Sequence, residues 1–518
     1  MTDRGTVADE RGLGAPRPTR SEGITVTVVT ALFVLVLCAF AVITRPYDAA
    51  DEMAHVDAVL QLATGHAWAA PGTMHVLDAV HASVSSASAA TATWGELLAG
   101  HPGYYERITD QMTQHPPTYY LIGAGFLHLI GFEDLHWSDG VLALRLLDVA
   151  FVAPLPVIAW ATVRRLTRSG RAGVVGAAAV LAVPQVAVVG SAVTNDAPVL
   201  LFSGLVTLVA VRVLTGDRRL LVAVLLALLT GALVWFKGTG LPAVPFVLVA
   251  VLLPAVRWWG WPRALPRTVV VGAVTAAVGS WWWLHNLLAY GTVQPDGFVA
   301  RKAQSFPDGQ GPDLAQFVQV TWDTIVRTFW GSSGVGASNA VTPYLSVVGT
   351  VLGIVVIAVF AFRRGRTLVP AITLAVLPVV ILLLQTQTTW SAYLRSTEIA
   401  GTQGRYYFPA LVALIALSAL AWRRLPRTEA GRRRLAAGIG IVAIAIAVYG
   451  VWLQWRAGWE GRSFLVTTGG IDDYAANGPV PLAALVVVLV ALLVGGVVAV
   501  VLVVRATRSV VPSTEGTA

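Results

Sequence analysis

The chain has 518 residues, of which 56% are apolar and only 12% are charged. Soluble proteins usually carry about 25% charged residues, so this chain lacks the charge that a surface facing water needs. The composition excludes a soluble enzyme, a disordered protein and a nucleic-acid-binding protein, and the net charge of +8 needs another explanation. The only cysteine, Cys38, also excludes an intramolecular disulfide and a zinc site built from two cysteines.

The first 23 residues are polar, contain four arginines and precede an apolar run at 24–44. A signal peptide would have a shorter apolar core and a small-residue cleavage site, whereas Arg45-Pro46 follows this run. We therefore expect a retained signal-anchor helix. Because positive charge stays on the inner side of a membrane, residues 1–23 are predicted to be a cytoplasmic tail.

Further apolar runs predict an all-α, polytopic membrane protein with about twelve transmembrane helices and additional juxtamembrane helices on the outer face. Each run is close to the length of about 20 residues that spans a hydrocarbon core. After the first helix, the predicted spans lie near 141–163, 172–190, 197–214, 220–236, 240–256, 268–288, 344–362, 367–384, 406–422, 435–453 and 481–504.

The arginines support this topology. The clusters at 164–168, 363–366 and 423–434 all fall on the side of the amino terminus, as the positive-inside rule requires. Both termini are then cytoplasmic, and the high net charge belongs to the cytoplasmic rim. The long outer loops are 45–117, 289–342, 385–405 and 454–479.

The apolar segment 119–132 does not fit as a span, because its 14 or so residues are too few to cross a bilayer comfortably. Counting it as a crossing would also move every later arginine cluster to the outside. We therefore predict a juxtamembrane or re-entrant helix on the outer face.

The first outer loop opens with two adjacent carboxylates, Asp51 and Glu52, and His55 follows one helical turn later. Such a group can hold and orient a general base close to the membrane. The alternative is an acidic helix start with a solvated face, since acidic residues favour a helix amino terminus. No cofactor is indicated. Asp51, Glu52 and His55 are ligand types that a divalent ion accepts, but their spacing is not typical of a metal site.

Other polar groups gather at predicted outer helix ends. Arg405 lies at such an outer end, although the positive-inside rule favours arginines on the inner side. Its guanidinium could hold a phosphate through paired hydrogen bonds. Charges at a membrane edge are costly and point to function, although Trp and Tyr at span ends are ordinary interfacial anchors and Asn195 could be a helix cap. The remaining candidates are His115, Tyr119, Arg145, Lys237, His285, Asn286 and Tyr406.

Together these motifs resemble the GT-C membrane glycosyltransferases, which include the protein O-mannosyltransferases and the lipid A aminoarabinose transferases. The resemblance covers 24–422. It rests on Asp51-Glu52, His-Pro-Pro-x-Tyr-Tyr at 115–120, Arg145, Trp-x-x-x-His-Asn-x-x-x-Tyr-Gly at 281–291 and Gln-Gly-Arg-Tyr at 403–406. His285 departs from the pattern, because an arginine is expected before Asn286.

The resemblance implies an integral membrane glycosyltransferase of the GT-C type that moves a hexose or pentose from a polyprenyl-phosphate donor. The acceptor would be a cell-envelope glycan, lipid or protein on the extracytoplasmic side of a bacterial cell membrane. Asp51 would be the general base of an inverting reaction, and Glu52 would support it or contact the acceptor. Arg405 would hold the donor phosphate, with His55, His115, Tyr119, Arg145, Lys237, His285, Asn286 and Tyr406 binding substrate.

This interpretation divides the chain into the tail 1–23, a catalytic membrane domain at 24–422 and carboxy-terminal membrane helices at 423–518. The main alternative is a multi-pass transporter or lipid flippase, which would carry ionisable residues near mid-span. A polymerase or ligase that uses lipid-linked oligosaccharides would share most of the proposed chemistry.

Overall fold

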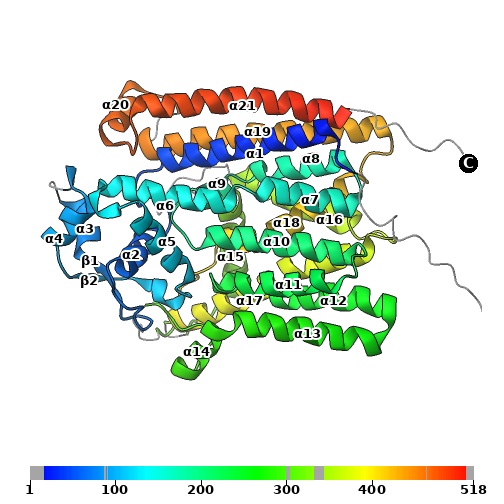
Figure 1. Ribbon diagram of the computed structural model, residues 1–518, viewed down its shortest axis with the longest axis horizontal. Coiled ribbons are helices and arrows are strands. Elements are labelled where there is room, and N and C mark those ends of the chain that lie inside the picture. Colours follow the sequence, from blue (N-terminus) through cyan, green and yellow to red (C-terminus); the bar gives the residue numbers. More distant parts are fainter. Residues whose placement is uncertain are drawn as a thin grey trace, which may run out of the picture.

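A computed structural model of the chain describes residues 17–86, 89, 91–298, 304–307, 309–331, 343–461 and 464–508 (Figure 1). Most of the predicted tail 1–23 and parts of the predicted outer loops 45–117, 289–342 and 454–479 lie outside the described residues. Within these ranges the chain is mostly helical and contains two short strands. The predicted all-α class is confirmed.

Long apolar helices form the body of the molecule and run side by side (Figure 1). Eight segments of the described chain are long and apolar enough to cross a membrane. They are α1 (Arg20–Ile43), α6 with α7 (Trp137–Val152, Leu155–Thr167), α10 (Asp196–Leu214), the 3₁₀ helix η6 with α12 (Gly238–Gly240, Ala243–Trp259), α17 (Leu368–Ser396), the 3₁₀ helix η7 with α18 (Gly404–Ala410, Leu411–Trp422), α19 (Glu429–Trp459) and α21 (Leu482–Arg508).

Two further predicted spans, 172–190 and 268–288, are bent rather than straight. The first bends by 69° between α8 with the short η5 (Gly170–Ala179, Val180–Ala182) and α9 (Pro184–Gly190). The second bends by 67° between α13 (Trp261–Gly279) and α14 (Trp281–Tyr290). Pro184 accounts for the first break, because proline has no amide hydrogen to continue a helix.

The number of spans differs from the predicted twelve. Counting each bent pair as one span gives up to ten in the described residues. The two other predicted spans, 220–236 and 344–362, coincide with shorter apolar helices, α11 (Leu220–Leu233) and α16 (Pro343–Phe360). The polytopic architecture is therefore confirmed, and the count of twelve is not.

A layer of short elements covers one end of the bundle, on the left in Figure 1. Strands β1 and β2 pair antiparallel within it. Helix α5 falls on the short apolar segment 119–132, has 12 residues and packs against α2. The elements of this layer are α2 (Glu52–Ala63), β1 (His75–Leu77), α3 (Asp78–Ser85), α4 (Trp94–Gly100), β2 (Tyr104–Thr109), η3 (Gln111–Gln114), α5 (Thr118–Leu129) and η4 (Phe132–Asp134).

Two more helices complete the described fold: α15 (Leu314–Trp330) packs against η7, and α20 (Thr468–Asn477) follows α19. The carboxy-terminal helices α19 and α21 both pack along α1. They lie together with α1 at the top of Figure 1, so the described part of the predicted region 423–518 adds to the same bundle.

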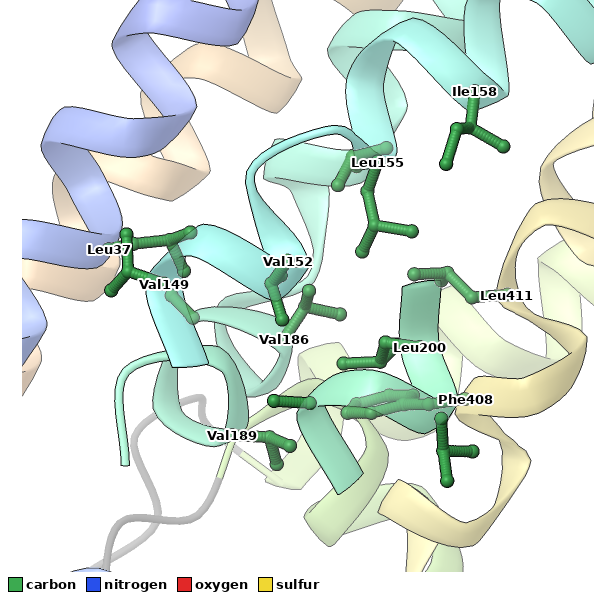
Figure 2. Close-up of a cluster of buried hydrophobic side chains, with 14 of the residues drawn as sticks. Leu37, Val149, Val152, Leu155, Ile158, Val186, Val189, Leu200, Phe408 and Leu411 are labelled. Carbon is green, nitrogen blue, oxygen red and sulfur yellow. The ribbon is translucent and has the colours of Figure 1, made fainter. Parts of the chain in front are cut away.

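Apolar side chains from seven elements, α1, α6, α7, α9, α10, η7 and α18, meet in the core of the bundle (Figure 2). A Cβ on Gly190 would lie 2.9 Å from Val152 Cγ1, so α9 approaches α6 closely. This packing fixes the ends of α9, α10 and η7 relative to one another, and these ends carry polar residues into the layer. The labelled members of the cluster are Leu37, Val149, Val152, Leu155, Ile158, Val186, Val189, Leu200, Phe408 and Leu411.

Cysteine labelling tests the predicted orientation, because Cys38 is the only native thiol. In a Cys38→Ala background, we expect a membrane-impermeant maleimide to modify Glu106→Cys, exposed on β2, in intact cells. It should modify Arg427→Cys, exposed beyond α18, only after the membrane is opened. The reverse pattern would place the layered end in the cytoplasm and contradict the predicted topology.

Candidate active site

Asp51 stands at the start of α2 in a left-handed conformation, with φ of +63°. A residue with a Cβ adopts this conformation at a cost of about 1 kcal/mol or more. The carboxylate does not cap the helix. Its Oδ2 accepts a 2.6 Å hydrogen bond from Arg405 Nη2, and Oδ1 lies 3.4 Å from Gln111 Nε2. The Asp51 side chain is 39% exposed, so its carboxylate remains within reach of a substrate.

Glu52, the next residue, points into the protein and is fully buried. Arg145 donates to both of its oxygens, from Nε at 2.7 Å and from Nη2 at 2.6 Å. The backbone amides of Tyr47 and Val193 donate to the same carboxylate. The remaining donors of Arg145 bind the carbonyl oxygens of Ala41, Thr44 and Arg45.

Arg145, which was expected to bind substrate, lies inside the protein in this geometry. Its side chain is only 1% exposed, and it joins the end of α1 to α2 and α6. Glu52 likewise has no oxygen open to an acceptor. Of the two roles expected for Glu52, the arrangement favours support of its neighbour Asp51.

A second buried ion pair lies beside Asp51. Lys237 Nζ is 2.8 Å from Asp196 Oδ1, and Arg405 Nε is 3.9 Å from Asp196 Oδ2. Neither Arg405 Nε nor Asp196 Oδ2 has a hydrogen-bond partner in the described structure. Both cations lie near the ring of Tyr406, at 5.9 Å and 5.7 Å from its centre.

Gly404 allows Arg405 to reach this cluster. A Cβ at Gly404 would lie 2.2 Å from the backbone nitrogen of Phe329 on α15. Only glycine avoids this clash with backbone atoms. The Gly404 amide also donates to Thr328 Oγ1 at 2.6 Å, so η7 is held tightly against α15.

Two neutral histidines border the cluster. His55 contacts the hydroxyl of Tyr120 through Nδ1 at 3.1 Å and Thr194 Oγ1 through Nε2 at 3.4 Å. Burial, followed by the nearby Lys237, lowers the pKa of His115 to about 3 and that of His55 well below its ordinary value. His115 Nδ1 is buried without a described partner. Both rings are therefore uncharged, and His115 keeps one nitrogen free of a described partner.

Tyr119 lies beside His55, but its hydroxyl points elsewhere. It donates at 2.8 Å to Asp148, which also accepts from the amide of Thr194 at 2.8 Å. Tyr119 therefore fixes the turn before Asp196 rather than facing the cluster.

His285 and Asn286 are not brought to the cluster by any contact in the described structure. His285 is exposed on α14 between the rings of Trp282 and Tyr290. Asn286 is buried and donates to the carbonyl oxygen of Val293 at 3.1 Å. The break between α13 and α14 turns this helix out of line, which the hydropathy pattern did not reveal.

A cavity of about 270 Å³ opens beside Arg405. Its wall combines the guanidinium with threonine and glutamine side chains and a few small apolar residues. This mixture offers several neutral hydrogen-bonding groups around one cation. The polar lining residues are Gln185, Thr194, Thr324, Thr328, Thr402, Gln403 and Arg405.

Several site residues were missing from the predicted set: Asp196, Tyr120, Thr194 and Gln111. Asn195-Asp196 was visible at the start of an apolar span but had the simpler interpretation of a helix cap. Asn195 instead donates to the hydroxyl of Tyr120 at 3.3 Å. Among the described residues, no group of three or more His, Cys, Asp or Glu side chains is arranged to hold a metal ion.

Two carboxyl groups, Asp57 and Asp110, meet behind the site. Asp57 accepts from the Leu77 amide and from Gln61, both at 2.7 Å, and Asp110 accepts from the Met112 amide at 2.8 Å. Burial raises the pKa of Asp57 to about 6 and that of Asp110 well above its ordinary value. The pair joins α2 to η3, which carries Gln111.

Comparisons with known proteins give one family match. Residues 114–283 match the model of the dolichyl-phosphate-mannose-protein mannosyltransferase family. This segment is about a third of the chain and includes His115, Tyr119, Arg145 and Lys237. No curated protein sequence matches the chain.

Solved structures resemble the chain at low identity. The crystal structure of ArnT from Cupriavidus metallidurans in the apo state has 15% identity and a TM-score of 0.49, covering 94% of this chain and 75% of that one. Its complex with undecaprenyl phosphate has 16% identity and a TM-score of 0.46, covering 93% and 75%. The apo oligosaccharyltransferase from Archaeoglobus fulgidus has 12% identity and a TM-score of 0.45, covering 89% and 60%.

Removing the partner of Glu52 should destabilise the protein. Arg145→Gln leaves a buried carboxylate without its counter-ion, which typically costs about 3–5 kcal/mol. We expect a large fall in the unfolding free energy measured in detergent. Asp323→Asn is the control, since it breaks the exposed 2.8 Å pair with Arg327 and should cost less than about 1 kcal/mol. Equal losses would contradict a structural role for Arg145.

The raised pKa values of Asp57 and Asp110 predict a specific pH dependence of stability. Because the folded-state pKa of Asp57 is raised, its contribution to stability is complete below pH 3.8 and is lost as the pH rises through about 6. Asp110→Asn removes the second carboxyl. We therefore expect the unfolding free energy of the variant to rise relative to that of the wild type as the pH increases from 4 to 8. A difference that does not change with pH would contradict the raised pKa values of the pair.

Proposed function

We propose that this protein is a membrane glycosyltransferase that moves a sugar from a polyprenyl-phosphate donor to a hydroxyl acceptor on the extracytoplasmic side. The observation that carries the proposal is the position of Asp51. It is the exposed carboxylate of the cluster, and it lies 2.6 Å from a buried arginine that lines a cavity. The family match supports the same chemistry, because residues 114–283 supply His115 and Lys237 to this site.

Exposure distinguishes Asp51 from the other carboxylates as the general base. The Asp196 side chain is only 10% exposed, and the Glu52 side chain is fully buried. An acceptor hydroxyl has too high a pKa to attack unaided, so a carboxylate must accept its proton as the new bond forms. Asp51 can meet such a hydroxyl without any movement of the core.

Arg405 and Lys237 supply the positive charge for the leaving phosphate. Fixed cations in a site of low dielectric stabilise the charge that develops on this group. Arg405 also contacts Asp51, so a donor phosphate that engages its guanidinium would release the Asp51 carboxylate. The donor would thus bind before the base becomes free to act.

The reaction then proceeds in one displacement. The acceptor oxygen bonds to the anomeric carbon while Asp51 takes its proton, and the bond from that carbon to the phosphate oxygen breaks. Polyprenyl phosphate leaves with the electron pair. Attack from the face opposite the phosphate inverts the anomeric configuration. Glu52 and Arg145 hold Asp51 in place. His115, whose Nδ1 has no partner in the described structure, offers a neutral group to the sugar.

Replacing the base tests the mechanism. Asp51→Asn keeps the shape of the side chain but cannot accept a proton, so transfer should slow by roughly 10²–10⁴-fold. The wild-type protein is first assayed with polyprenyl-phosphate hexoses and pentoses, and single-turnover rates of the variants are compared on the donor that reacts. Absence of turnover with every donor would contradict the proposed function.

Asp48→Asn is the matched control for Asp51→Asn. Asp48 is exposed in the same turn, three residues earlier, and its variant should react at close to the wild-type rate. If Asp51→Asn also keeps the wild-type rate while Glu52→Gln, at equal folded protein, abolishes transfer, then Glu52 is the base and the assignment is wrong.

Replacing Arg405 tests the phosphate contact. Arg405→Lys should be nearly as harmful as Arg405→Ala, because an ammonium cannot reproduce the two-pronged geometry of a guanidinium. Loss of such a contact costs on the order of 2–5 kcal/mol of transition-state stabilisation, measured as kcat/KM for the donor. Arg395→Ala, exposed at the end of α17, is the control. Near-normal transfer by Arg405→Lys would contradict the phosphate contact and show that Arg405 acts only as an interfacial charge.

A further inference from the structure

A second and larger cavity lies at the opposite end of the bundle from Asp51. Three connections meet there: the turn between α7 and α8, the turn between α16 and α17, and the segment between α18 and α19. The cavity has a volume of about 600 Å³. Residues 405 and 423 are separated by η7 and α18, and 18 helical residues extend about 27 Å. This cavity is therefore separate from the proposed active site.

The lining of this cavity is strongly basic. Six arginines surround it, against one acidic residue, Glu429, among the lining residues that the structure describes. Glu429 is already engaged by Arg171 at 2.6 Å, Arg432 at 3.0 Å and Arg433 at 3.3 Å. The six lining arginines are Arg168, Arg171, Arg366, Arg423, Arg424 and Arg432.

Arg423 and Arg424 are held in place by uncharged groups rather than by a carboxylate. Arg424 donates to the carbonyl oxygen of Phe360 and to Thr367 Oγ1, both at 2.6 Å, and Arg423 donates to the carbonyl oxygen of Thr167 at 3.1 Å. These acceptors are uncharged. Burial, and then the neighbouring Arg432 and Arg171, lower the pKa of Arg423. Like charges crowded in this way gain stability from a bound anion.

One donor in the wall has no partner. Arg171 Nε is buried and makes no hydrogen bond in the described structure, although Nη1 of the same side chain binds Glu429. A guanidinium presents its donors in a fixed plane that matches the oxygens of a phosphate. The unused donor therefore suits a bound anion with several acceptor atoms.

We propose that this cavity binds the phosphate group of an anionic phospholipid at the cytoplasmic membrane surface. Leu166, Leu420 and Trp422 add an apolar part to the wall beside the arginines, which suits a lipid better than a soluble ion. The cavity also joins three inter-helix connections, so a bound headgroup would hold them together. This proposal does not depend on the function assigned to Asp51.

Native mass spectrometry of the full-length protein in a neutral detergent tests the site with two lipids. Phosphatidylglycerol should be retained in preference to zwitterionic phosphatidylcholine. The double variant Arg171→Gln/Arg423→Gln should bind phosphatidylglycerol roughly tenfold more weakly or worse, since it loses two charged hydrogen-bond donors. The double variant Arg427→Gln/Arg434→Gln is the matched control, because it removes the same charge from exposed arginines outside the cavity.

Inorganic phosphate distinguishes the two sources of the anion. Phosphate that leaves lipid retention unchanged supports a lipid site, and phosphate that displaces the lipid supports a phosphate site that also accepts the free ion. Equal weakening by both double variants, or no preference for phosphatidylglycerol, would overturn the proposal. If the first double variant does not fold, Arg366→Gln replaces it; this exposed lining arginine should weaken retention several-fold, and an unchanged value would also overturn the proposal.

Discussion

The buried pair of Glu52 and Arg145 is the interaction on which the rest of the layered end depends. Removing two charges from water costs several kcal/mol each, and their attraction offsets this cost only when the remaining donors and acceptors are satisfied. Here every donor of Arg145 has an acceptor, and Glu52 also accepts two backbone amides. The pair thereby ties together the end of α1, the start of α2, the middle of α6 and the turn before α10.

This constraint gives two adjacent carboxylates different roles. The Glu52 side chain is fixed inward, and the left-handed backbone conformation of Asp51 turns the Asp51 side chain outward, toward Arg405. The turn that Glu52 holds through Val193 leads directly to Asp196, the partner of Lys237. One buried ion pair thus places both carboxylates and, through them, both cations of the candidate site.

Much of this arrangement was predictable, because hydropathy and arginine placement are local signals. The predicted spans coincide with helices, and Asp51, His55, His115, Lys237 and Arg405 do meet. The partnership of Glu52 with Arg145 was not predictable, since 93 residues separate them and nothing in a single sequence links the two. The bends at 183 and 280 were also missed, because a hydropathy window records how apolar a segment is and not its direction; the second bend leaves His285 exposed away from the cluster.

The arginines at the two ends of the segment formed by η7 and α18 have different partners, and each set of partners suits a different role. Arg405 at one end faces two carboxylates, Asp51 and Asp196, which compete with any incoming phosphate. That competition suits a site that must bind a phosphate donor and later release its product. Arg423 and Arg424 at the other end are held by uncharged carbonyl and hydroxyl oxygens, so an anion bound there would displace no counter-ion. Such a site suits a resident ligand. The segment formed by η7 and α18 would then connect a site whose phosphate is exchanged in each reaction with a site whose phosphate stays bound.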